Sequence, residues 1–252
     1  MTVKPRLAKI GLLIVVIVLL AVAITVVTKG IFIAEATYTS PSLNDYLIET
    51  PTKGGKSEEN KNIDWSELRA INPRIVGWVS VEDTPIDYPI VHAPTDDPDY
   101  YLTHNFYDQE NALGTPYLGA ECTNINDSIT WIFAHHSLSD RLFSSFSRFS
   151  DVGFAKAHPI TLYTPCENGA TRTTALSTGA VRIVNADVET GVVSSFASNA
   201  DLLHWYIPLY QKASVQLEEI HLGDKLRAFV TCSYTTFENE RTIVFAYEKT
   251  TT

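Results

Sequence analysis

The sequence predicts a mainly β domain, an eight-stranded barrel with peripheral helices, preceded by an N-terminal transmembrane helix. Three observations support this prediction. About eight short segments beyond residue 74 are rich in β-branched and aromatic residues and are separated by turn-forming residues. Few of the intervening stretches have helical spacing, and many short strands with few helices are typical of a closed barrel. The chain begins, in contrast, with a basic tail and a long apolar run.

Residues 10–28 are predicted to be a transmembrane signal-anchor. The 18 residues from Ile10 to Val27 (27 − 10 + 1) carry no charge, which is close to the ~20 that a helix needs to cross a bilayer. The apolar part of a cleaved signal peptide is usually shorter, about 7–15 residues, so we expect the anchor to be retained. Basic flanks stay inside, so residues 1–9 are predicted to be a cytoplasmic tail and the remainder extracellular, at the cell membrane.

Residues 29–62 are predicted to be an extracellular stalk, because the stretch 51–61 is polar, contains glycine and has few apolar residues. Short helices are expected over 43–49 and 63–69, and Asn72-Pro73 should end the second one. The folded domain is predicted to occupy residues 63–252.

The domain's strands are expected in the β-rich segments 75–81, 87–91, 114–118, 128–134, 159–164, 180–184, 225–232 and 241–248. Pro89 favours an edge position for the second of them. Helices are expected over 142–149 and 195–211, where apolar residues recur at helical spacing. Pro208 should kink the second helix or end it early.

Charge and cysteine content restrict the partners. A formal net charge of −10 argues against nucleic acid. Cysteines of exported proteins tend to pair, yet this chain has three, so at least one lies outside any intramolecular disulfide. Either Cys122 and Cys166 form a disulfide and leave Cys232 for chemistry, or both are unpaired and structural.

Cys232 ends one predicted strand and Arg241 begins the next. Their offset of nine residues (241 − 232) suits a hairpin-like return that brings the guanidinium to the level of the thiol. A nearby fixed cation favours the reactive thiolate, and it can also stabilise a developing oxyanion. The alternative is a buried cysteine near an unrelated surface arginine.

A thiol nucleophile needs a base or an imidazolium beside it. Of the seven histidines, His135 and His136 end an apolar strand, as Cys232 does, and two strand ends can lie side by side on one rim of a barrel. Adjacent side chains point apart, and no carboxylate or cysteine lies at ligand spacing from this pair. We therefore expect neither a metal site nor a cofactor.

These motifs resemble those of class B sortases, over roughly residues 63 to 249. The cysteine run with its downstream arginine is the more specific part of the resemblance. The long helical segment before the penultimate strand is similar to class B rather than to class A or C. The segments that carry the similarity are 72–79, 86–91, 133–136, 142–146, 230–234 and 237–244.

Sortases are membrane-bound cysteine transpeptidases of Gram-positive bacteria built on an eight-stranded β-barrel. The resemblance implies that Cys232 is the nucleophile, His135 the general acid/base, and Arg241 the group that positions substrate and stabilises the oxyanion. It also implies two partners, the sorting-signal peptide of a secreted protein and an amine from a peptidoglycan precursor or a pilin. Ala134 stands where the family usually has glycine. Because alanine is also small, we keep His135, rather than His136, as the expected general acid/base.

Three alternatives stay open at this point. A pilin-polymerising sortase would differ from a wall-anchoring one in its accepting amine. A membrane-tethered binding barrel without catalysis has Ala134 as its only support. Other cysteine enzymes fit less well: an L,D-transpeptidase-like site has its arginine almost next to the cysteine, and papain-like enzymes place the cysteine before the histidine. The segment 187–210 is where we expect substrate to be read.

Overall fold

The computed structural model describes residues 4–48, 62–188, 191–233 and 239–249, with α1 side chains described at 12, 13 and 15–30. The chain divides into two compact units, Met1–Tyr38 and Thr39–Thr252. The predicted stalk segment 51–61 and the loop 234–238 lie outside the described residues.

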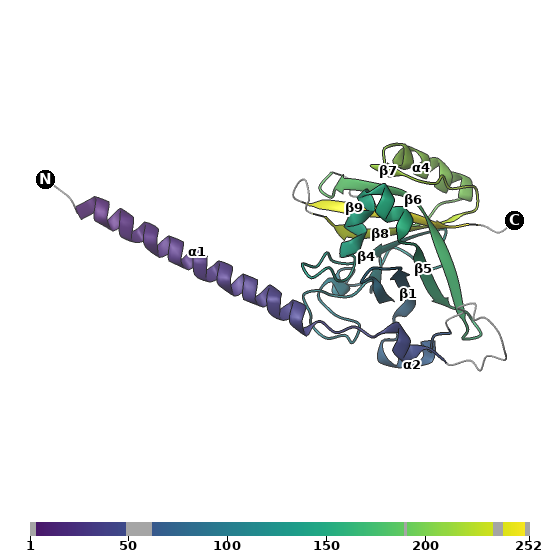
Figure 1. Ribbon diagram of the computed structural model, residues 1–252, viewed down its shortest axis with the longest axis horizontal. Coiled ribbons are helices and arrows are strands. Elements are labelled where there is room, and N and C mark those ends of the chain that lie inside the picture. The colour runs from purple at the N-terminus through teal and green to yellow at the C-terminus, as the bar shows by residue number, and fades with distance from the viewer. Residues whose placement is uncertain (1–3, 49–61, 189–190, 234–238, 250–252) are drawn as a thin grey trace. The chain divides into compact units, whose positions relative to one another are not determined.

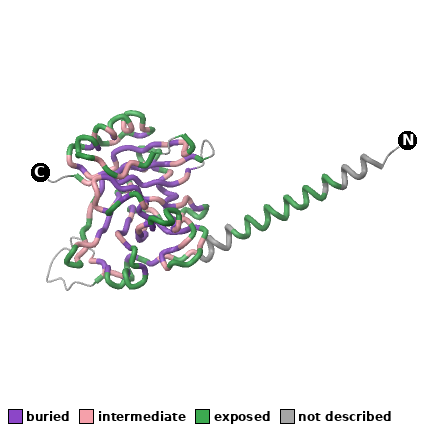
Figure 2. Tube along the Cα trace, turned by 180° about the vertical axis from the view of Figure 1, so that it is seen from behind, coloured by how far each residue is buried: buried purple, intermediate pink, exposed green. Residues whose placement is uncertain are grey.

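The first unit is the helix α1 (Lys4–Thr37), which runs past the predicted end of the membrane anchor at residue 28. Its described side chains are exposed (Figure 2). A helix long and apolar enough to span a membrane is not found among the described residues. The predicted anchor 10–28 includes side chains at 10, 11 and 14 that lie outside them.

The second unit contains a sheet that closes on itself (Figure 1). Eight strands pair in the order β5-β1-β2-β3-β4-β8-β9-β6, and a further β5–β6 pairing completes the ring. This confirms the predicted eight-stranded barrel, to which β7 is added on β6. The described strands are β1 (Ile75–Val81), β2 (Asp87–His92), β3 (Tyr117–Leu118), β4 (Ile129–Phe133), β5 (Ile160–Pro165), β6 (Thr171–Asn185), β7 (Val215–Gln216), β8 (Lys225–Cys232) and β9 (Glu240–Glu248).

Short helices lie between the strands, and side-chain caps explain where three of them begin. Asp64 accepts from the backbone N–H groups of Ser66 and Glu67, Asp151 from Phe154, and Ser198 from Asp201, which satisfies donors that a helix start leaves unpaired. The described helices of this unit are η1 (Leu43–Tyr46), α2 (Trp65–Ile71), η2 (Tyr100–Leu102), η3 (Ser144–Ser150), α3 (Val152–Ala157) and α4 (Asn199–Gln211).

Several predicted elements differ from the structure. β6 begins at Thr171 rather than at residue 180, because its polar first half pairs with β5 along their whole shared length. The helix expected over 142–149 is the 3-10 helix η3, in which serine hydroxyls bond to carbonyls one turn earlier. Pro208 is expected to kink its helix or end it early; it does not end the helix, because α4 continues three residues to Gln211.

Aromatic packing fixes the position of β8. Phe143, Phe146 and Phe149 of the η3 region are fully buried. Phe229 of β8 lies against two of them, with ring centroids 5.9 Å from Phe143 and 5.0 Å from Phe146. Such pairs contribute about 0.5–1.5 kcal/mol beyond the apolar area that they bury. The strand that ends at Cys232 is therefore held by a dense core just before its last residues.

Gly179 of β6 is closely packed against Tyr206 and Glu218. It lies at a register shift between Thr178 and Ala180, and an added Cβ would lie 3.0 Å from Tyr206 Oη and 3.2 Å from the Glu218 carbonyl oxygen. We expect Gly179→Ala to destabilise the fold by about 1–3 kcal/mol through overpacking. Chemical denaturation measures this. Gly191→Ala is the matched control, since nothing lies within 4 Å of its added Cβ; equal midpoints for both variants would contradict the prediction.

Candidate active site

Cys232 and Arg241 face each other across two antiparallel strands. The β8–β9 register runs without a shift from Lys225↔Glu248 to Cys232↔Arg241. Directly opposed residues project to the same face, with Cβ atoms about 4.5–5.5 Å apart. Both residues are half-buried. The nine-residue offset in the sequence therefore becomes a direct cross-strand pair.

His135 follows the neighbouring strand on the other side of β8. β4 and β8 are parallel, with Phe133 opposite Val230, and the Ala134 N–H donates to the Val230 carbonyl at 3.2 Å. His135 comes two residues after Phe133, the last residue of β4, and Cys232 comes two residues after its partner Val230 in β8. Cys232 and Arg241 are thus paired across β8 and β9, and His135 follows the end of the strand on the other side of β8.

Backbone groups hold His135 in place. Its Nε2 lies 2.9 Å from the carbonyl oxygen of Leu102, at the end of η2. Its own carbonyl accepts from the Phe143 N–H at 3.2 Å. The adjacent His136 instead forms an isolated β-bridge with Leu142. The His135 ring is therefore held beside the end of β4 by the Leu102 carbonyl.

Three other histidines make hydrogen bonds or ring contacts with residues other than Cys232. His92 Nε2 bonds to the Cys122 carbonyl at 2.9 Å. His158 Nδ1 bonds to the Glu82 carbonyl at 2.8 Å and its ring lies on Phe154. His104 stacks on Tyr100 at 3.9 Å. These contacts explain the three histidines as structural residues.

The Arg241 guanidinium has donors to spare. Within the described part of the chain, its hydrogen bond is from Nη1 to the Glu240 carbonyl at 3.1 Å. A guanidinium carries five N–H donors in a fixed fork and stays protonated. The remaining donors can meet a carbonyl oxygen or an oxyanion of a bound substrate.

The segment before β8 is fastened to the face that carries Cys232. Trp131 lies opposite Ala228, and Ala228 and Cys232 alternate onto the same face of β8. The Trp131 indole N–H donates to the Val193 carbonyl at 2.9 Å, and its ring lies 6.3 Å from that of Trp205 in α4. Val193 and Trp205, both in the segment 187–210 that is predicted to recognise substrate, therefore contact the face of the sheet that carries the thiol.

All three cysteines are free, so the possible Cys122–Cys166 disulfide is not formed. Cys122 is buried, and burial raises the pKa of its thiol to about 11. The Trp131 N–H points to its Sγ at 3.4 Å. Cys122 is thus a structural thiol, in contrast to the half-buried Cys232.

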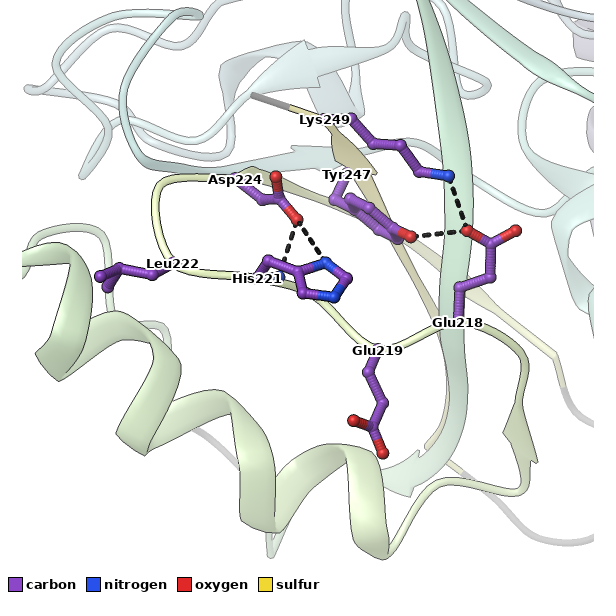
Figure 3. A pocket seen from close by; sticks show the side chains of 7 residues that line it. All are labelled: Glu218, Glu219, His221, Leu222, Asp224, Tyr247 and Lys249. Carbon is purple, nitrogen blue, oxygen red and sulfur yellow. Dashed lines mark hydrogen bonds and ion pairs between the residues drawn. The ribbon is translucent and has the colours of Figure 1, made fainter. Parts of the chain in front are cut away.

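A cavity of about 670 Å³ lies at the opposite end of the β8–β9 pair, beside Asp224 and Lys249 (Figure 3). Its polar groups satisfy one another: Glu218 accepts from Tyr247 at 2.7 Å and from Lys249 at 3.0 Å, which lowers the pKa of its carboxyl group. No thiol lines it. Across the described residues, no group of three or more His, Cys, Asp or Glu side chains could hold a metal ion.

Known proteins similar to this chain are sortases B. No family model matches the sequence. Sortase B of Listeria monocytogenes is 34% identical over 106 residues, which cover 42% of this chain and 41% of that protein. Sortase B of Staphylococcus aureus is 25% identical over 107 residues, covering 42% and 43%. The matched region thus spans about two fifths of these curated relatives.

Solved structures are similar over more of the chain. Clostridium perfringens sortase B superposes with a TM-score of 0.66 at 27% identity, over 73% of this chain and 99% of that one. A Bacillus anthracis protein described as similar to sortase B gives a TM-score of 0.65 at 22% identity, over 83% and 92%. The second likeness concerns the fold alone. Together, the sequence and structural neighbours support a class B sortase.

The cysteines should differ in reactivity toward iodoacetamide at pH 8. With a pKa of about 11, Cys122 is thiolate only to about one part in a thousand at that pH. We expect rapid alkylation of Cys232 and Cys166 and almost none of Cys122 until the protein is unfolded. Peptide mapping by mass spectrometry measures each site. Alkylation of Cys122 in the folded protein at the rate of Cys166 would contradict the burial argument.

Proposed function

We propose that this chain, whose sequence and structural neighbours support a class B sortase, is a cysteine transpeptidase acting on secreted proteins. It cleaves a C-terminal sorting signal, forms a thioester on Cys232 and transfers the acyl group to an amine of the cell wall. One observation carries the proposal: a thiol, a guanidinium and an imidazole converge at the ends of β8, β9 and β4.

In the first step, the Cys232 thiolate attacks a backbone carbonyl of the sorting signal. A bond forms between Sγ and the carbonyl carbon, and the negative charge passes to the carbonyl oxygen. The Arg241 guanidinium, across the strand pair from Cys232, is positioned to stabilise that oxyanion. The C–N bond then breaks, and the imidazolium of His135 gives its proton to the departing amine. A thioester and a neutral His135 result.

In the second step, an amine attacks the thioester. The new C–N bond forms while His135 accepts a proton from the attacking nitrogen, and the C–S bond breaks to return the Cys232 thiolate. The site therefore ends with the same thiolate and imidazolium with which it began. Two solved sortase B structures with the same fold are described as a Staphylococcus aureus substrate complex and a complex with triglycine. These descriptions support a peptide donor and an amine acceptor here.

Substrate is proposed to lie along the face formed by β4 and β8. The described part of the segment 187–210 borders that face, because the Trp131 indole binds the Val193 carbonyl and Trp205 of α4 packs on Trp131. The donors of Arg241 other than the one bonded to the Glu240 carbonyl are proposed to hold the scissile carbonyl at one end of this face. We therefore assign recognition of the sorting signal to 187–210.

The chain is proposed to act at the membrane surface of a Gram-positive cell. Residues 10–28 would anchor it, with 1–9 in the cytoplasm, 29–62 as a stalk and 63–252 as the catalytic domain outside. The support is the uncharged run from Ile10 to Val27 behind Lys4, Arg6 and Lys9.

Replacing the proposed catalytic residues should separate their roles. Cys232→Ala should abolish cleavage and thioester formation. Arg241→Lys keeps the charge but loses the planar fork, so kcat should fall by about 10–1000-fold. The assay follows a labelled sorting peptide with either triglycine or a lysine peptide as acceptor, by chromatography and mass spectrometry. Cys166→Ala is the control and should retain activity. No cleavage by the wild type, and no labelling of Cys232 by an electrophilic peptide, would refute catalysis.

Membrane attachment is tested by fractionating cells that express the full chain or a chain lacking residues 1–28. We expect the full chain to sediment with membranes and to resist extraction at high salt, because burial of an apolar helix is not screened by ions. The shortened chain should appear in the supernatant or the medium. Salt extraction of the full chain would exclude a spanning anchor.

A further inference from the structure

The carbonyl oxygen of Leu102 is the hydrogen-bond partner of the His135 ring, at 2.9 Å from Nε2. We infer that η2 and Gly114 form a positioning device that holds this carbonyl in place and thereby fixes the tautomer of His135. Nδ1 is then the ring atom that exchanges protons during peptide transfer. This inference rests on the proposed function and assigns Gly114 and Tyr101 to it as positioning residues.

The chemistry of the contact determines the tautomer. A carbonyl oxygen can only accept, so Nε2 must carry the proton in this hydrogen bond. A neutral imidazole has one N–H, so in this state Nδ1 is the bare nitrogen that can accept a proton. Among the described residues, Nδ1 of His135 has no hydrogen-bond partner. The hydrogen bond from Nε2 to the Leu102 carbonyl thus orients the ring, and Nδ1 is the nitrogen available for proton transfer.

Gly114 packs closely against the backbone of Tyr101 and Leu102, the turn that carries this carbonyl. It adopts φ +63°, a left-handed conformation that favours glycine. An added Cβ would lie 2.1 Å from the carbonyl oxygen of Tyr101 and 3.0 Å from both the carbonyl carbon and oxygen of Leu102. The next residue, Thr115, donates its N–H to the Tyr101 carbonyl at 3.0 Å. A larger residue at 114 therefore forces a shift at its contacts with Tyr101 and Leu102, which include the acceptor of His135.

The other side of η2 is fixed by a buried polar cluster. The Tyr101 side chain is 1% exposed. Its oxygen accepts from Asn72 Nδ2 at 3.3 Å, and its hydroxyl donates to Asp108 Oδ1 at 3.4 Å. Asn72, itself fully buried, also donates to the Phe106 carbonyl at 2.9 Å. Burial raises the pKa of Tyr101 to about 12, so it remains a neutral donor. η2 is thus clamped from both sides.

This arrangement suits both proton transfers. In the imidazolium form, Nε2–H keeps its bond to Leu102 while the Nδ1 proton moves to the nitrogen of the departing amine, as the C–N bond breaks and the thioester remains. The product is the neutral tautomer protonated at Nε2, which the carbonyl stabilises. The incoming amine then returns a proton to Nδ1. Because the Nε2 contact persists throughout, the ring does not have to rotate between the two steps.

The first test measures the tautomer directly. Histidines of the full chain, in detergent micelles, are labelled with ¹⁵N, and the ring signals are recorded at a pH where His135 is neutral. Comparison with His135→Gln identifies its signals. We expect a protonated Nε2 and an unprotonated Nδ1, distinguished by their ¹⁵N shifts and couplings to the ring protons. A neutral His135 that carries its proton on Nδ1 would overturn the inference.

The second test uses a matched pair of glycine variants. Gly114→Ala should lower kcat by about 10–100-fold with a smaller change in KM, because the acid is misplaced, and it should increase the Nδ1–H tautomer. Gly169→Ala is the control: Gly169 also has a positive φ, +81°, but nothing lies within 4 Å of its added Cβ. Equal kcat and equal His135 spectra for the two folded variants would overturn the inference.

Tyr101→Phe keeps the ring and removes only the hydroxyl links to Asn72 and Asp108, so it serves if Gly114→Ala does not fold. We expect a smaller change in the same direction, about two- to tenfold in kcat, with a measurable change in the His135 tautomer. An unchanged kcat and an unchanged His135 spectrum would overturn the inference that the Tyr101 hydroxyl helps to position η2. The spectra need no activity, so a wild type that carries the Nε2 proton but transfers no peptide would refute the proposed function alone.

Discussion

The register of β8 against its two neighbours is the constraint on which the site depends. β8 is antiparallel to β9, with an unshifted register as far as Cys232, and parallel to β4, with an unshifted register as far as Val230. Because side chains alternate along a strand, a slip of one residue in either pairing would move Cys232 to the opposite face from Arg241 or His135. The three groups come from distant parts of the sequence, yet two ladders of backbone hydrogen bonds are enough to align them. No disulfide or ion pair between them is needed.

The register itself depends on packing on the other face of the sheet. Phe229, three residues before Cys232, packs against the rings of Phe143, just before η3, and Phe146, within η3. The connection from His136 to η3 includes Leu142, which is fully buried at φ 54° with its N–H bonded to the Tyr88 hydroxyl at 3.2 Å. A left-handed leucine costs about 1–3 kcal/mol and persists only where its surroundings over-determine it. Here the β-bridge to His136 and the Tyr88 hydroxyl constrain Leu142, seven residues after the proposed acid/base.

The sequence was sufficient for features that depend on local pattern. The end of β8 at Cys232, the end of a strand just before His135, and the nine-residue return to Arg241 follow from apolar runs that stop at polar residues. Features that depend on partners from elsewhere were missed. The polar first half of β6 is a strand only because β5 pairs with it. The role of Leu102 lies in its backbone carbonyl, which the identity of its side chain does not reveal. Gly114 becomes informative only when the structure shows Tyr101 and Leu102 packed beside it. β7 is two residues long and has no readable period.

Ala134, the residue that sets this chain apart from the usual sortase pattern, is explained by the same backbone geometry. Its N–H continues the ladder to Val230 at 3.2 Å, and it is not among the described residues with positive φ. Glycine would be required only for a left-handed backbone or a closer approach than a methyl group allows. Ala134 is 7% exposed, so its methyl group is accommodated beside β8. The alanine is therefore compatible with the backbone that leads from β4 into His135, and it does not argue for a non-catalytic barrel.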